Sequence, residues 1–241
     1  MKYVLTGVML AAMAFTSCRK EKENVIPAPL TGNLAVNVDY HVDGKQLYFD
    51  SLIYTNAAGN QYSVTKVHYY LSRFRLYKEG SVKYASDTII YVDAEKAMNF
   101  SFRNVPAMTY DSMSFHIGLD EAQNKSNSLP ATAENVNMGW PDVMGGGYHF
   151  LKLEGHWLDS SKKLGYAMHI GNNGFLVRAG AKANIEVNGG KTANCKLMMN
   201  INEWFAHPNT YNLAADGVYS MGNAPLMKKL SENGGDVFGL E

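Results

Sequence analysis

Hydrophobic and polar residues alternate along most of the chain after residue 32, which is the pattern of half-buried β-strands. In NLAVNVDYH, residues 33–41, Leu34, Val36, Val38 and Tyr40 take one face, and the residues between them, with His41, take the other. Similar patterns predict strands within 62–78, 81–93, 112–119, 148–155, 165–171, 175–180, 183–190 and 193–202. Because strands recur about every ten residues and helical periodicity is nearly absent, we predict an all-β fold, an antiparallel immunoglobulin-like β-sandwich with long loops.

Turn and cap residues separate the predicted strands and mark where a helix begins and ends. The paired glycines of VNGGKT, residues 187–192, predict a hairpin, because glycine supplies the positive φ that primed turns need. One short C-terminal helix is predicted in NAPLMKKLSENGG, with Asn223 as N-cap, Pro225 in the first turn and Asn233-Gly234 at its end. The polar, aperiodic segment 124–137 predicts a long loop, and such loops often carry function.

The loop leads into MGWPDVMGGGYHF, residues 138–150, where unusual side chains are concentrated. Its three consecutive glycines predict a bend through which the chain enters the next strand. Trp140, flanked by Met138 and Met144, is the candidate functional side chain of this segment. His149 shares its predicted face with Leu151 and Leu153, so we expect it to be structural.

The N-terminal segment predicts export and a lipid anchor. Residues 1–17 carry an early lysine and an apolar run, which are typical of a signal peptide and too short to span a bilayer stably. Thr16 and Ser17 before Cys18 resemble a bacterial lipobox, which would make Cys18 the lipidated first residue of the mature protein. The alternative is an ordinary secreted protein. Residues 18–32 are then a flexible tether, and the folded domain spans 33–241.

Composition narrows the classes of partner. Lys plus Arg and Asp plus Glu number 22 each, so no basic excess favours nucleic acid. With Cys18 lipidated, Cys195 is the single remaining cysteine and no intrachain disulfide can form. Cys195 alternates with Leu197 and Met199 in a predicted strand, so we expect a buried, unreactive thiol.

No common catalytic motif is present, so we predict a binding protein and not an enzyme. The chain lacks GxSxG, HExxH, a phosphate-binding loop and CxxC. None of the seven histidines pairs with another at helical chelating spacing, so a metal site must be assembled from separate strands. His41 and His169 are the candidates, because each lies on the polar phase of its strand and near a strand end. Thioethers and imidazoles suit Cu(I), which makes Met138 and Met144 secondary candidates.

The order of several segments resembles the MbnP-like family of exported proteins, over about residues 33–239. These segments are YHVDG, SVTKVHYYLSRFRLY, FHIGLD, MGWPDVMGGGYHFLKLEG, AMHIG and the C-terminal NGGDVF. The resemblance implies copper held by two histidines and an oxidised tryptophan, kynurenine, which a partner dihaem peroxidase produces. The corresponding residues are His41, His169 and Trp140, and we expect the three to converge.

Each liganding histidine should have its second ring nitrogen fixed by a carbonyl or a carboxylate. Asp39, Asp43, Asp120 and Glu154 are available for this role, and of these Glu154 is expected to be structural, capping the Leu-Glu-Gly turn.

Three functions follow as hypotheses. The first is a lipid-anchored copper-binding protein of the bacterial outer membrane, periplasmic or surface-exposed. The second is a metal-free β-sandwich lipoprotein that serves an outer-membrane transporter, with aromatic loops such as NEWFAHP, residues 202–208, as contacts. The third is a carbohydrate-binding or hydrolytic module that uses Trp140 and Tyr148 as a stacking platform.

Overall fold

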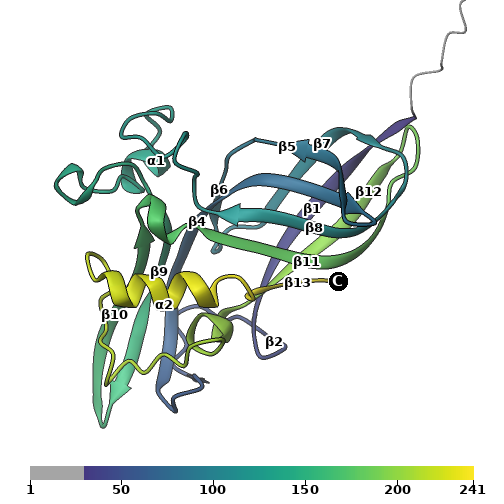
Figure 1. Ribbon diagram of the computed structural model, residues 1–241. Helices are drawn as coiled ribbons and strands as arrows, with labels where there is room; N and C mark the ends of the chain where they lie inside the picture. Colours follow the sequence, from purple (N-terminus) through teal and green to yellow (C-terminus); the bar gives the residue numbers. More distant parts are fainter. Residues whose placement is uncertain (1–29) are drawn as a thin grey trace, which may run out of the picture.

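The computed structural model describes residues 30–241, apart from the side chain of Ala183, and its strands form two sheets (Figure 1). The first sheet has the order β13–β12–β1–β2, with β7 also paired to β1. Its strands are β1 (Thr31–Val42), β2 (Lys45–Gln46), β7 (Met98–Pro106), β12 (Thr192–Asn200) and β13 (Phe238–Leu240). The predicted signal peptide, Cys18 and most of the predicted tether lie outside the described residues.

The second sheet is built around one long strand, β4. Its order is β10–β9–β4–β8–β11, and β3, β5 and β6 also pair with β4. Its strands are β3 (Tyr54–Thr55), β4 (Gln61–Lys78), β5 (Ser81–Ser86), β6 (Ile90–Asp93), β8 (Thr109–Ile117), β9 (His149–Asp159), β10 (Lys162–Gly171) and β11 (Val177–Glu186).

The predicted all-β, sandwich-like fold is confirmed, with differences in strand pairing. β1 pairs in parallel with β12, from Asn33 opposite Thr192 to His41 opposite Asn200, so the first sheet is not purely antiparallel. The predicted hairpin at 187–192 is wrong, because β11 and β12 belong to different sheets. The turn bonds instead to β1: the amide of Gly190 donates to the carbonyl of Thr31, and that of Asn33 to the carbonyl of Lys191.

The structure confirms most of the remaining strands and the C-terminal helix, with a few differences in their bounds. The predicted segments 175–180 and 183–190 merge largely into β11, and β7 is absent from the predicted strands although it alternates. Cys195 is buried, as predicted. The C-terminal helix is confirmed as α2 (Ala224–Asn233), where the Asn223 side chain accepts a hydrogen bond from the amide of Leu226. Among residues 30–241, no helix is long and apolar enough to cross a membrane.

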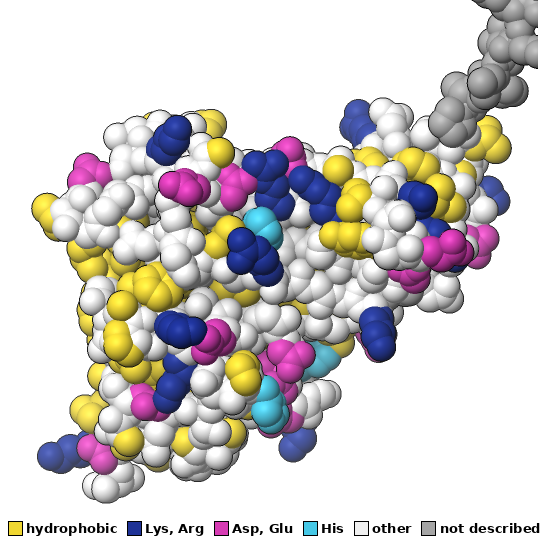
Figure 2. All heavy atoms as spheres, viewed as in Figure 1, with side chains coloured by type: hydrophobic (Ala, Val, Ile, Leu, Met, Phe, Trp, Pro, Cys, Tyr) yellow, Lys and Arg dark blue, Asp and Glu magenta, His cyan; other side chains and the backbone are white. Residues whose placement is uncertain are grey.

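Short helices occur in the connections between strands. They are α1 (Ala133–Asn137), η1 (Asp142–Met144), η2 (Asn173–Phe175) and η3 (Ile201–Phe205). We call residues 124–148, which contain α1 and η1, the covering loop, because they lie over part of the second sheet. Figure 1 shows this region beside the upper end of β9, and Figure 2, viewed from the same side, shows Lys and Arg side chains interspersed with Asp and Glu over the visible face. The predicted long loop is therefore partly helical, with Thr132 as the N-cap of α1.

Candidate metal site

A row of buried polar side chains crosses the second sheet. Strand register places Asp93 of β6 opposite His68 of β4, His68 opposite Lys152 of β9, and Lys152 opposite His169 of β10. Each of the four residues is at most 9% exposed. The covering loop closes over the row, because the Lys152 ammonium donates to the carbonyl of Asn137 at 2.5 Å. Such a row is unusual, since ionisable groups are rarely buried without a role.

His169 is held on two sides and leaves one ring nitrogen without a partner. Its Nε2 lies 3.0 Å from Oε1 of Glu154, while its Nδ1 is buried and has no hydrogen-bond partner among the described residues. The pKa of Glu154 falls to about 2, through the hydrogen bond with His169 and the ion pair with Lys66, which together outweigh burial. An ionised Glu154 places a proton on Nε2. In the neutral ring, Nδ1 then carries a lone pair.

The backbone of His169 is fixed as well. Its amide donates to Oγ of Ser220 at 2.7 Å, and the Ser220 hydroxyl donates to the carbonyl of His169 at 2.7 Å. The ring is therefore positioned from both its backbone and its side chain, which favours a defined site over a mobile surface residue.

His149 also has one ring nitrogen held by a protein acceptor, but here it is Nδ1, whereas in His169 it is Nε2. Its Nδ1 lies 3.1 Å from the carbonyl oxygen of Met138, which can only accept, so Nδ1 carries the proton. Burial, followed by the charges of Lys152 and His169, lowers the pKa of His149 to about 3, so the ring is neutral at physiological pH. The lone pair is then on Nε2. The rings of His149 and His169 stand edge to face, with centroids 5.0 Å apart.

Trp140 completes this cluster on the side of His149. The two ring centroids are 4.7 Å apart, and the indole Nε1–H donates to the carbonyl of Met144 at 3.1 Å. The ring packs against Gly171, where a Cβ atom would lie 2.3 Å from Trp140 Cε3. Only glycine permits this approach. We call these residues the Trp140–His149–His169 cluster.

The glycine bend positions the cluster, as the sequence predicts. Gly145, Gly146 and Gly147 all have positive φ. A Cβ on Gly147 would lie 2.3 Å from Oδ1 of Asn124, and that same oxygen accepts the amide of Tyr148 at 2.8 Å. The bend thus delivers the chain into β9 with His149 under the covering loop.

The predicted ligand set is divided by the structure. Trp140 and His169 lie in one cluster, but His41 is in β1 of the other sheet, with its Nε2 3.2 Å from Sδ of Met198. The hydrogen bonds and ring contacts of His41 and His169 share no residue within the described part of the chain. The proposed role of His41 as a copper ligand stays a prediction.

The remaining candidates take other positions. Met138 is fully buried in the main core, whereas Met144 is half-buried, with its methyl group against Gly222. The expected capping role of Glu154 is wrong, because Glu154 lies within β9, where it binds His169 and Lys66. The rings of Trp140 and Tyr148 line a cavity of about 390 Å³ but are only 3% and 4% exposed, which does not suit a sugar-stacking platform.

A second group of potential ligands lies elsewhere within residues 30–241. Glu203, His207 and Asp236 offer ligand atoms within 4.8 Å of one another. His207 and Asp236 are exposed, and Nδ1 of His207 lies 2.8 Å from Oε2 of Glu203. The set is rich in carboxylate oxygen, which suits harder ions than copper, and it contains none of the predicted residues.

Comparisons with known proteins identify the family. The MbnP family profile matches residues 31–223. The chain belongs to the MbnP family. The solved structure of MbnP from Methylosinus trichosporium matches with a TM-score of 0.56 and 14% identity, covering 87% of this chain and 98% of that one. At this identity the likeness shows the shared fold. No curated protein sequence matches the chain.

The cluster of this MbnP-family chain contains imidazoles, a ligand type that copper accepts. Both imidazoles have one nitrogen held by a protein acceptor, and Nδ1 of His169 is buried without a described partner, which is how metal-ligating histidines are arranged. Sequence reasoning missed His149, because strict alternation places it with Leu151 and Leu153. A register shift between Ile170 and Gly171, where β10 pairs with β9, breaks that alternation.

Proposed function

We propose that this MbnP-family chain is an exported, lipid-anchored protein that binds copper at the Trp140–His149–His169 cluster. His149 Nε2 and His169 Nδ1 would be the ligands. The observation that carries the proposal is that His169 has Nε2 fixed by Glu154 and Nδ1 buried without a described hydrogen-bond partner, beside the ring of His149, whose Nδ1 is fixed by a carbonyl. Copper is favoured because imidazole nitrogens suit it and because of the resemblance to exported copper-binding members of the family.

Trp140 is the third member of the proposed site. Its ring lies against His149 and is 3% exposed, so any change to the indole would be felt at the metal. By the family resemblance, a dihaem peroxidase partner would oxidise Trp140 to kynurenine. That product would offer carbonyl and amine groups beside His149. Peptide mapping of the segment 138–150 by mass spectrometry, with and without a coexpressed peroxidase, tests this step.

The lipid anchor and the location at the outer membrane belong to the same proposal. Cys18 would carry the lipid, and the protein would face the periplasm or the cell exterior at the outer membrane. Its role would be binding and not catalysis.

Copper analysis of the full-length protein tests the site. The wild type is expected to retain copper after dialysis, and the double variant His149→Gln plus His169→Gln is expected to lose it. The control is His207→Gln, which removes an exposed histidine from the carboxylate group and should leave the copper content unchanged. Retention of copper by the double variant would contradict the proposal. A wild type that binds no copper but copurifies with an outer-membrane transporter would favour the interaction role.

A further inference from the structure

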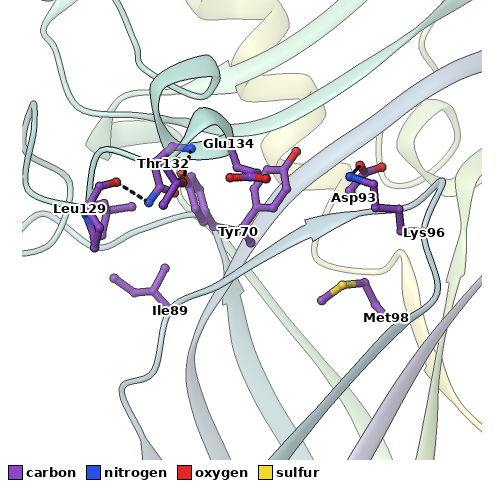
Figure 3. Close-up of a pocket in the computed structure, with 11 residues that line it drawn as sticks. Tyr70, Ile89, Asp93, Lys96, Met98, Leu129, Thr132 and Glu134 are labelled. Carbon is purple, nitrogen blue, oxygen red and sulfur yellow. Dashed lines mark hydrogen bonds and ion pairs between the residues drawn. The ribbon is translucent and has the colours of Figure 1, made fainter.

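A hollow on the other side of the covering loop has no part in the proposed copper site. It has a volume of about 550 Å³ and lies between β4, β6 and β7 on one side and the segment 129–135 on the other (Figure 3). This size is within the range of small-molecule sites. Figure 3 shows Leu129 and Ile89 toward one end, and Asp93 with Lys96 at the other.

Aromatic and aliphatic side chains form most of the lining. The rings of Tyr70 and Tyr91 stand edge to face with centroids 5.9 Å apart, and Ile89, Met98 and Leu129 add apolar surface. Tyr70 is rigidly placed, since its hydroxyl donates to Oδ1 of Asn135 at 2.7 Å. The hollow therefore offers the half-buried ring of Tyr91, packed against the fixed and buried ring of Tyr70, and the face of such a ring attracts cations.

The charges at the hollow do not cancel. Asp93 is neutralised by Lys96, whose ammonium is 2.9 Å from Oδ2. Glu134 also lines the hollow but forms no ion pair with a described residue. Its pKa is lowered by its own backbone amide and by Thr132, so it is ionised at neutral pH. Burial first, and then the charges of Asp93 and Glu134, raise the pKa of Tyr91 to about 12, consistent with a negative potential at this ring.

We infer that this hollow binds a small organic ammonium ion that carries an aromatic or aliphatic body. The body would pack against Ile89, Met98 and Leu129, and the ammonium group would lie near Glu134 and a tyrosine ring. A carboxylate that forms no ion pair with a described residue, near the ring of Tyr91, favours a cation over a neutral or an anionic ligand. A concave hollow favours a small molecule over the flat face of a protein.

The test compares three ligands of nearly equal shape on the full-length protein. These are 2-phenylethylammonium, 2-phenylethanol and phenylacetate, titrated at low salt while backbone amide NMR shifts are followed. The ammonium ion is expected to shift resonances of the residues lining the hollow and to bind roughly five-fold or more tightly than the alcohol, with phenylacetate weakest. Added salt should weaken binding of the ammonium ion.

Variants locate the charge. Glu134→Gln should weaken binding of 2-phenylethylammonium by roughly five-fold, because it removes the unpaired carboxylate while keeping the side-chain shape. The matched control is Glu95→Gln, which changes a nearby exposed glutamate that does not line the hollow. Tyr91→Phe should retain binding, and Tyr91→Leu should weaken it, because the ring face and not the hydroxyl meets the cation.

The comparison of ligands and the comparison of variants together distinguish this proposal from its alternatives. Equal affinity for the alcohol and the ammonium ion would overturn it, as would equal effects of Glu134→Gln and Glu95→Gln. Shifts caused by a lysine-containing peptide but not by 2-phenylethylammonium would also overturn it and would indicate a protein partner. The histidine variants of the copper test leave this hollow intact, so failure of one proposal does not imply failure of the other.

Discussion

His169 and His41 lie on strands of different sheets, and what surrounds each strand differs. His169 lies under the covering loop, 9% exposed, with Glu154 fixing one ring nitrogen and no described partner for the other. His41 is half-buried on the first sheet and contacts a neighbouring side chain, Met198. A strand histidine therefore becomes a candidate ligand through what covers it, and the phase of its strand alone does not decide this.

The covering loop supplies the difference. It brings the carbonyl of Met138 to His149, the carbonyl of Asn137 to Lys152, and the ring of Trp140 to the edge of His149. Near His41, the contacts are hydrogen bonds among exposed or half-buried groups, such as Asn200 with Asp43. Burial strengthens polar interactions and penalises unpaired groups, so the hydrogen bonds made under the covering loop hold their side chains more firmly than those around His41.

The largest expected effect comes from filling the space against Trp140. Gly171→Ala should lower the free energy of unfolding by about 1–3 kcal/mol and weaken copper binding, because the new Cβ would overlap the indole ring. Gly174→Ala, three positions along, is the matched control, since a Cβ there meets nothing within 4 Å. Urea unfolding of both variants measures the difference. Equal stabilities would show that Trp140 does not depend on Gly171.

Removing the carboxylate that orients His169 should have the next effect. Glu154→Gln is expected to weaken copper binding by about 10- to 100-fold, because the charged acceptor fixes the ring and its tautomer. Lys66→Gln removes the other partner of Glu154 and should cost less than about five-fold, because that ion pair is partly exposed. Competition with a copper chelator gives both affinities. Similar losses in the two variants would mean that charge, and not orientation, governs the site.

Acid should destabilise the covered face through His149. Its pKa is about 3 in the folded protein, against a usual value of 6.5. As pH falls below 6.5, the unfolded chain takes up a proton that the folded protein does not, so stability falls. The loss is at most about 1.4 kcal/mol per pH unit down to the folded pKa. Chemical unfolding of metal-free protein at pH 6.5 and 4.5 should show a smaller drop in His149→Gln. An unchanged drop would contradict the burial of a neutral ring.

The smallest effects on stability and copper affinity are expected at His41 and Met198 of the first sheet. His41→Gln and Met198→Leu should each change the free energy of unfolding by less than about 0.5 kcal/mol and leave copper affinity within about two-fold. Thermal unfolding and the same chelator competition measure both quantities. Loss of copper in His41→Gln would reverse the comparison and make His41 a ligand, as the family resemblance implies.

Sequence patterns predict the local features of this fold more fully than its pairings. Alternation located most strands, and Asn223, Pro225 and Gly234 marked α2, because caps and turns depend on a few adjacent residues. The parallel pairing of β1 with β12 could not be predicted in the same way, since partners distant in sequence compete for the same strand edge. Trp140 stood out from its neighbours, but His149 did not, because a register shift is not encoded in the alternation of one strand.

Gly171 and Trp140 together occupy one fixed volume, with the ring filling the space that a side chain on the strand would take. The two positions should therefore vary as a pair among related sequences. A lineage that acquires a larger residue at 171 would have to replace the indole at 140 with something smaller. Such a lineage would then lose the aromatic ring next to His149. The residue at position 171 of β10 should therefore distinguish family members that retain this cluster from those that lack it.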